Sequence, residues 1–143
     1  MNILKKNAGC IFLFIIVLII LYFCIHNQIC EYYEQLDPIL YKIKGQLRLL
    51  HPSVDKLKFL EGKKSYTINK KKVYLCLKDE NGEYYDYNML MYVALHELSH
   101  VICDEIGHTP KFHRIFEDIL RRAEEIKIYD SSIPLIKNYC GHN

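Results

Sequence analysis

The sequence predicts an α+β domain that follows one membrane-spanning helix, and three observations support this prediction. An uncharged apolar run extends from Cys10 to Ile25 near the N-terminus. Short strand-like runs separated by turn residues lie between residues 54 and 78, and longer stretches with helical spacing follow them. A chain of 143 residues has room for one small domain. We place this domain at residues 31–143, after an N-terminal segment at residues 1–30.

The apolar run is long enough for a transmembrane helix, which we predict over about residues 8–26. As a helix, this run spans about 27 Å, close to the hydrocarbon thickness of a bilayer. No small-x-small cleavage site follows it, so an uncleaved single-pass anchor is favoured over a signal peptide. Lys5 and Lys6 precede the run, and no basic residue follows it before Lys42. The positive-inside rule therefore places the N-terminus in the cytosol and the domain on the opposite side.

The charge of the domain argues against a nucleic-acid partner. Lys5 and Lys6 account for the formal net charge of +2, because residues 31–143 contain 17 basic and 17 acidic side chains. A balanced domain has no electrostatic footprint for a phosphate backbone, so no nucleic acid is expected. The Lys70–Lys72 run is interpreted as a solvated turn. Nothing in the sequence indicates an oligomeric state.

The cysteines do not form a recognisable framework. Cys10 and Cys24 lie within the apolar run, and the other four have no C-x-x-C spacing, so neither a zinc knuckle nor a redox pair is indicated. A disulfide among those four requires that the domain faces an oxidising compartment. The four are Cys30, Cys76, Cys103 and Cys140.

The elements of the predicted domain follow from capping residues and periodicity. Asp37 and Thr109 each precede a proline, which is typical of an N-cap followed by the first helical residue. The expected helices lie near residues 38–50, 87–104 and 110–127, and the expected strands cover residues 54–61, 65–69 and 73–77, the last two as a hairpin. The tail from residue 129 to residue 143 is expected to be irregular.

Residues 96–100 read H-E-L-S-H, which indicates a metal site on the second of these helices. Histidines four residues apart lie on the same face of a helix, as two ligands of Zn²⁺ require. Glu97 can then act as general base on a metal-activated water without being a ligand. The surrounding run is apolar and therefore buried, where unpaired polar groups are costly. The alternative is that His96 and His100 are core residues bonded to backbone carbonyls.

A catalytic zinc site needs a third protein ligand, and His108 is the best candidate. It lies eight residues beyond His100, directly after Gly107, where the helix can end and the chain can turn back. It also directly precedes the predicted N-cap Thr109. The alternatives for the third ligand are Cys103, Asp104 and Glu105.

The motif His96–His100, followed by a histidine and a phenylalanine at positions 108 and 112, resembles the H-E-L-x-H…H-x-x-x-F pattern of zincin metallopeptidases of the WLM and SprT-like type. Over roughly residues 35–143 the chain is also similar to small membrane-anchored predicted metallopeptidases of large DNA viruses. The resemblance is carried by Ser65–Thr67, Tyr74–Asp79 and Val93–Leu98. It implies a minimal zincin-like fold with one catalytic Zn²⁺ held by His96, His100 and His108, and with Glu97 as base.

Two features separate this chain from the WLM pattern. The interval of eight residues between the second and third histidines is longer than is usual for WLM proteins. Many WLM proteins act on DNA-bound protein, whereas this chain combines a predicted anchor with a neutral domain. We therefore expect a protein or peptide substrate and a lipid bilayer as its partners, without DNA.

Two functions remain open at this level. The first is a membrane-anchored zinc-dependent metallopeptidase, with an oxyanion-stabilising group among Tyr129, Tyr139 and His113, and with the strand at residues 73–77 as an edge for substrate pairing. The second is a non-catalytic, zinc-stabilised binding or structural module. In that case Cys103 or Asp104, as a fourth ligand, would close the site.

Overall fold

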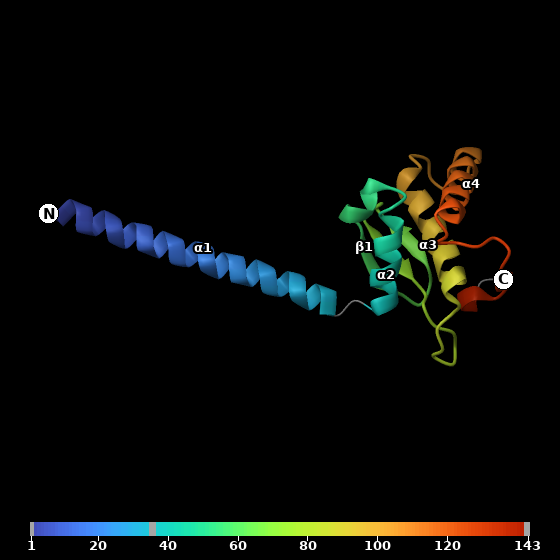
Figure 1. The fold of residues 1–143 in the computed structure, drawn as a ribbon, viewed down its shortest axis with the longest axis horizontal. Coiled ribbons are helices and arrows are strands. Elements are labelled where there is room, and N and C mark those ends of the chain that lie inside the picture. The colour runs from blue at the N-terminus through green and yellow to red at the C-terminus, as the bar shows by residue number, and fades with distance from the viewer. Residues whose placement is uncertain (1, 35–36, 142–143) are drawn as a thin grey trace. The chain divides into compact units, whose positions relative to one another are not determined.

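The computed structural model describes residues 2–34 and 37–141, and these form an α+β protein. The α+β class is therefore confirmed, whereas the zincin-like character of the domain stays a prediction. The chain divides into two compact units at the boundary between residues 36 and 37. In chain order the elements are α1 (Asn2–Glu34), α2 (Pro38–Leu47), the 3₁₀ helix η1 (Pro52–Lys56), β1 (Lys58–Glu61), β2 (Tyr66–Ile68), β3 (Lys72–Leu75), α3 (Tyr87–Ile102), α4 (Pro110–Glu125) and the 3₁₀ turn η2 (Tyr139–Gly141) (Figure 1).

Helix α1 contains the apolar segment that the sequence predicts as an anchor. Within it, Ile11–Ile29 is long and apolar enough to cross a membrane, and no part of that segment is buried against the rest of the described chain. The helix continues past the predicted limits of residues 8–26, because flanking residues such as Asn27 and Gln28 do not break a helix. Length and composition agree with the predicted anchor, and the orientation across the membrane stays a prediction.

The three strands form one sheet in the order β1-β3-β2. Strand β3 is parallel to β1 and antiparallel to β2, so the predicted hairpin of β2 and β3 is confirmed. Its turn contains two consecutive residues with positive φ, Asn69 at 50° and Lys70 at 52°. Such a pair gives a turn the twist that a hairpin needs. Because β3 is central, β2 is an edge strand, with no further strand paired to it among the described residues.

The first strand, β1, starts later than the sequence predicts. The sequence predicts a strand over residues 54–61, but Pro52–Lys56 forms η1 and β1 starts only at Lys58. Pro52 sets the backbone for a helical turn, and the Nδ1 atom of His51 accepts a hydrogen bond from the Ser53 amide at 3.2 Å. The buried residue Val54 therefore belongs to this 3₁₀ helix and not to a strand.

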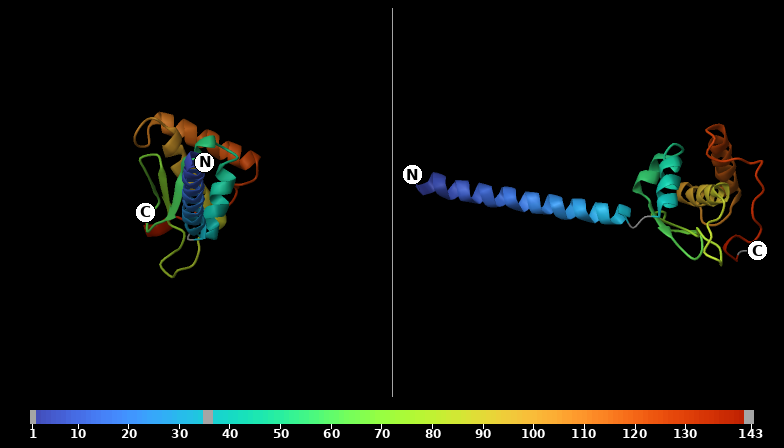
Figure 2. Two further views of the ribbon diagram at one scale, coloured as in Figure 1. Left: turned by 90° about the vertical axis from the view of Figure 1, so that its left-hand side faces the viewer. Right: turned by 60° about the horizontal axis from the view of Figure 1, so that its bottom comes forward.

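Helix α3 is the centre of the second unit. It packs against β2 and β3 on one side and against α4 on the other, while α2 contacts β1 and α3 (Figures 1 and 2). Alternate residues of the sheet face this helical layer. The largest fully buried side chains come from the sheet, from all three helices and from η1, and include Leu40, Ile43, Leu47, Phe59, Leu75, Leu90, Leu95, Leu98 and Phe112. The motif helix is therefore buried, as its composition predicts.

The predicted starts of α2, α3 and α4 are confirmed, and each of these three helices ends two or three residues earlier than predicted. Asp37 accepts a hydrogen bond from the Ile39 amide at 2.8 Å, and Thr109 accepts one from the Phe112 amide at 3.3 Å. Helix α3 ends at Ile102, because the backbone of Cys103 is extended. Gly107 then has φ +84°, which lets the chain reverse before α4 begins.

Candidate metal centre

Three imidazole rings meet at the C-terminal end of α3. His96 and His100 project from one face of that helix, and His108 projects from the loop between α3 and α4. The Nε2 atoms of His96 and His100 are 3.2 Å apart, and those of His100 and His108 are also 3.2 Å apart. Those of His96 and His108 are 3.0 Å apart. The three predicted ligands therefore form a compact triangle that could hold a metal ion.

The geometry of this triangle fits a bound cation. In a neutral imidazole each nitrogen is either a donor or an acceptor, so three mutually facing nitrogens always include a pair of the same kind. A cation that accepts all three lone pairs removes this conflict. Three nitrogens that ligate one ion at 2.0–2.1 Å with tetrahedral angles lie roughly 3.3 Å apart. The observed separations are close to that value.

The protonation of the ligands favours the same conclusion. Burial, with smaller contributions from the charges of His100, His108 and His113, lowers the pKa of His96 to about 4. Burial also lowers the pKa of His100, with a smaller contribution from the charge of His108. Both rings are therefore neutral at pH 7, and a neutral imidazole is the form that binds a metal.

A phenylalanine from α4 contacts all three ligand rings. Phe112 is fully buried and stacks on His100, with ring centroids 4.3 Å apart and an interplanar angle of 28°. It meets His96 and His108 edge to face, at 5.0 Å and 4.9 Å. Because Phe112 begins the buried stripe of α4, the packing of α4 on α3 fixes the directions of the ligand rings.

Glu97 lies beside the ligands and has a hydrogen-bond partner that the sequence did not indicate. Its side chain is buried, and the Thr67 hydroxyl donates to its Oε2 atom at 2.8 Å. The same hydroxyl lies 3.3 Å from the Glu97 carbonyl oxygen. Burial raises the pKa of Glu97, and the hydrogen bond from Thr67 opposes this shift. Thr67 belongs to the edge strand β2, which places this strand next to the predicted base.

The three histidines and Glu97 open onto a cleft of about 560 Å³, which we call the metal cleft. One wall is formed by Ser65, the strand β2 and the turn after it, including Thr67 and Lys70, and the other by the loop at residues 105–108. The Lys70 ammonium donates to the Cys103 carbonyl and ties the hairpin turn to the end of α3. On the loop, Ile106 is 95% exposed at the rim of the cleft.

One expectation about this region is wrong. The strand at residues 73–77 is predicted to offer an edge for substrate pairing, but β3 is paired on both sides. Among the described residues, the unpaired edge beside the cleft belongs to β2. Tyr129, Tyr139 and His113 are not among the residues that line the metal cleft, and the oxyanion-stabilising group stays a prediction.

The alternative ligands do not join the triangle. Cys103 is completely buried and behaves as a small core residue. Asp104 forms an ion pair with Lys111 at 2.6 Å. Glu105 lines the metal cleft without joining the ligand group. Among the described residues, the ligand group therefore consists of the three histidines that the sequence predicts.

Comparisons with known proteins show similarity to viral proteins. The chain is 51% identical over 104 residues to an uncharacterized protein of Invertebrate iridescent virus 6, an alignment that covers 69% of the chain and 58% of the relative. It is 48% identical over 86 residues to an uncharacterized protein of Invertebrate iridescent virus 3, covering 59% of the chain and 54% of the relative. A third uncharacterized relative, from Acanthamoeba polyphaga mimivirus, is 42% identical over 67 residues, which are 46% of the chain and 34% of the relative.

The chain thus spans less than three fifths of the length of the curated relatives it matches. No family model matches the chain, and no solved structure matches it. The similarity to proteins of large DNA viruses agrees with that part of the resemblance seen in the sequence.

Proposed function

We propose that this protein is a membrane-anchored, zinc-dependent metallopeptidase with a minimal zincin-like domain. The observation that carries the proposal is the arrangement at the C-terminal end of α3. Three imidazole nitrogens, two from α3 and one from the loop after it, form a triangle with sides of 3.0–3.2 Å, and the buried Glu97 carboxylate on α3 lines the same cleft. A site that only stabilises a fold has no use for such a carboxylate.

The proposed chemistry divides between the metal and Glu97. Bound zinc lowers the pKa of a water ligand to about 7 and polarises a carbonyl group. Glu97 would take the proton from the attacking water and return it to the leaving amine. Because Thr67 occupies Oε2, the other carboxylate oxygen, Oε1, is the one available for this proton. Thr67 would thus position Glu97 without contacting the substrate.

The edge strand supports a polypeptide as the substrate. Strand β2 borders the metal cleft and has an outer edge that no described strand pairs with. An extended peptide can pair with such an edge through its backbone, independently of its sequence. Tyr66, which is 42% exposed, and Ile106, which is 95% exposed, both line the cleft and offer apolar contact to substrate side chains.

The non-catalytic zinc module is the competing interpretation, and it gains no support from the ligand group. Closing the site requires a fourth protein ligand. Cys103 is buried away from the triangle, and Asp104 is paired with Lys111. The open side of the triangle faces the metal cleft.

The proposal is tested by measuring zinc content and proteolysis together on the full chain in detergent micelles. Wild-type protein with one zinc per chain should cleave a denatured protein substrate. Glu97→Gln should keep the zinc and lose about 10²–10⁴-fold in rate, the range expected for a general base. Glu117→Gln, a change of an exposed glutamate on α4, is the matched control and should leave both quantities unchanged.

Two results would contradict the proposal. If zinc-dependent cleavage persists in Glu97→Gln at the wild-type rate, Glu97 is not the base. If the wild-type protein binds one zinc but cleaves no unfolded substrate, the non-catalytic module is the better interpretation.

A further inference from the structure

The C-terminal turn η2 is fastened to the start of the edge strand β2. The Tyr139 side chain is buried, and its hydroxyl lies 2.8 Å from the Ser65 Oγ atom and donates to the Cys76 carbonyl at 2.5 Å. The Ser65 Oγ atom in turn accepts a hydrogen bond from the Cys76 amide at 3.0 Å. These contacts join η2, the start of β2 and the end of β3. We call the set Ser65, Cys76, Tyr139 and Cys140 the tail clasp.

A disulfide closes the tail clasp. Cys76 and Cys140 are bonded through their sulfur atoms, although they lie 64 residues apart in the sequence. Cys140 has a left-handed backbone with φ 49°, a conformation that residues other than glycine seldom hold without support. The disulfide provides this support, together with the Tyr85 hydroxyl, which accepts a hydrogen bond from the Cys140 amide at 3.0 Å. The turn at Cys140 is therefore held by its bonds and is free to relax without them.

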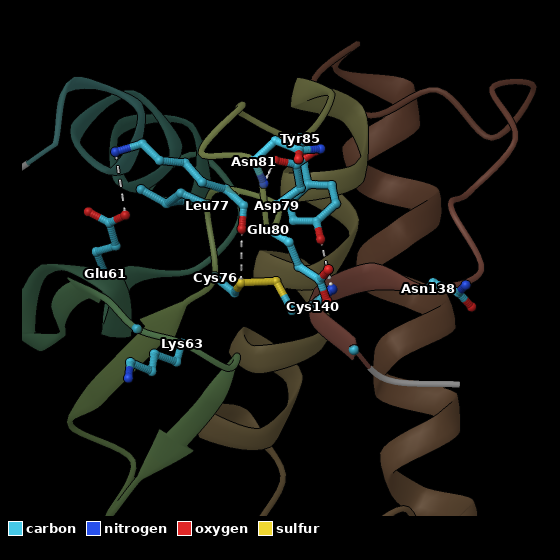
Figure 3. Close-up of a pocket in the computed structure, with 13 residues that line it drawn as sticks. Glu61, Lys63, Cys76, Leu77, Asp79, Glu80, Asn81, Tyr85, Asn138 and Cys140 are labelled. Atoms are coloured by element: carbon cyan, nitrogen blue, oxygen red, sulfur yellow. Dashed lines mark hydrogen bonds and ion pairs between the residues drawn. A yellow bond between two sulfur atoms is a disulfide. The ribbon is translucent and has the colours of Figure 1, made fainter.

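The disulfide lines a pocket of about 1090 Å³ on the side of the sheet where η2 lies (Figure 3). Figure 3 shows the Cys76–Cys140 bond among the lining side chains, below Tyr85, with Lys63 further down and to the left. Cys76 is buried, whereas Cys140 is half-buried and is therefore the more accessible partner. We call this space the disulfide pocket. Its volume is sufficient for a peptide-sized thiol to approach Cys140.

The tail clasp also borders the metal cleft. Ser65 lines the metal cleft and stands two residues before Thr67 in the chain. Thr67 donates the hydrogen bond that holds the Glu97 carboxylate. A short edge strand is held on one side only, so its position depends on contacts at its ends. The tail clasp supplies such a contact at the N-terminal end of β2.

We propose that the Cys76–Cys140 disulfide controls the metal cleft and is opened by a thiol reductant that enters through the disulfide pocket. Reduction frees η2, withdraws Tyr139 from Ser65 and loosens β2, so that Thr67 no longer holds Glu97 in place. The effect on catalysis rests on the proposed function. The effect on the strand does not.

The exchange balances with two thiols as reductant. A thiolate attacks the Cys140 sulfur, the Cys76–Cys140 bond breaks, and Cys76 leaves as a thiolate. A second thiolate then attacks the mixed disulfide and releases Cys140. The reductant ends as a disulfide, having given up two electrons, and its two protons pass to Cys76 and Cys140. The two thiols come either from one dithiol protein or from two molecules of a monothiol such as glutathione.

The strand effect is tested by amide hydrogen exchange on the full chain in detergent micelles with zinc present. In Cys140→Ser the amides of residues 66–68 should exchange at least roughly tenfold faster than in wild type, while the protected amides of α3 stay unchanged. Tyr139→Phe keeps the disulfide but loses both hydroxyl contacts, and it should produce part of the same increase. Cys24→Ser, in α1, is the matched control and should behave as wild type.

Unchanged exchange of residues 66–68 in Cys140→Ser would overturn the inference. If Cys140→Ser fails to fold, as judged by loss of protection in α3, Tyr139→Phe decides the question in the same way. Because these measurements need no proteolysis, they hold even if the proposed function fails.

The opening step is tested by treating wild-type protein with reduced glutathione or with reduced thioredoxin, followed by alkylation and mass spectrometry. After treatment with either reductant under native conditions, we expect alkylation of Cys76 and Cys140. The reductant that gives more alkylation identifies the source of the thiols. Resistance to both reagents would overturn the inference. Where the protein is proteolytic, reduction should lower kcat by roughly threefold or more, because the base loses its positioning contact. It should have no such effect on Cys140→Ser.

Discussion

The metal cleft and the disulfide pocket both border the β2–β3 hairpin, yet they are built in opposite ways. The groups of the metal cleft that we propose as metal ligands and base lie within 13 residues, from His96 to His108, and most of them come from one helix. The disulfide pocket joins residues 64 positions apart, and its central bond depends on the complete fold. A local motif can thus specify reactive groups, while long-range contacts specify the position of the strand beside them. The two regions meet at Ser65 and Thr67.

Loss of one ligand should give the largest effect and should be confined to the metal cleft. His108→Ala removes one of the three proposed metal ligands, so zinc affinity should fall by roughly 100-fold or more and proteolysis should disappear. His113→Ala, at an exposed position one turn into α4, should keep its zinc. Zinc titration against a competing chelator measures both. The assignment of His108 is wrong if it is His113→Ala or Cys103→Ala that releases the metal while His108→Ala retains it.

Removal of the disulfide should give the next largest effect, on stability rather than on metal binding. Closing a loop of 64 residues is worth about 4 kcal/mol by loop entropy, so Cys140→Ser should lose a free energy of unfolding of that order. Denaturant unfolding followed by tyrosine fluorescence measures this loss. Zinc affinity should change little, because the histidine triangle is held by α3, α4 and Phe112. A fall in affinity as large as that of His108→Ala would mean that the two regions are not separable.

The pH dependence of stability in the metal-free protein should be smaller and should come from the metal cleft. Burial lowers the pKa of His96 from 6.5 to about 4, so between these values the unfolded chain binds a proton that the folded chain does not. Stability is therefore highest above pH 6.5 and falls as the pH decreases toward 4, by on the order of 1–2 kcal/mol between pH 7 and pH 5. Urea unfolding in the presence of a chelator measures this slope. In His96→Gln the slope should be shallower, and an unchanged slope would assign it to other groups.

The hydrogen bond that links the two regions should give the smallest effect. Thr67→Val removes the donor to Glu97 and should lower kcat by about tenfold, since a hydrogen bond to a charged group contributes on the order of 1.5 kcal/mol. Thr67→Ser keeps the hydroxyl and should restore most of the rate. Neither change should release zinc. Equal losses in both variants would mean that packing of the threonine methyl group, rather than its hydroxyl, is what matters.

The sequence predicted those parts of the molecule whose cause is local. The positions of His96, Glu97 and His100 follow from helical periodicity, and that of His108 follows from a glycine stop and an N-cap. The starts of α2 and α4 follow from a capping residue before a proline. Each of these signals lies within a few residues of the feature that it predicts.

The missed features depend on distant partners. Thr67 has no local pattern that marks it, because its role comes from Glu97, 30 residues later. The pairing of Cys76 with Cys140 follows only from where the tail meets the sheet. The strand order β1-β3-β2 could not be predicted from local patterns either. The turn between β2 and β3 contains no residue that indicates the parallel pairing of β1 with β3. The edge beside the cleft was therefore assigned to the wrong strand.

The contact of Phe112 with all three ligand rings has a consequence for how fast an ion leaves. Rings that are held by packing do not swing away when one metal–nitrogen bond breaks. If a zinc ion is bound as we propose, an ion that loses one nitrogen would still face that nitrogen at bonding distance, and the bond would reform before the other two break. Escape would then require all three bonds to be open at once, so the rigid aromatic support would lengthen the residence time of the ion. Phe112, which is not a proposed ligand, would thereby slow metal exchange.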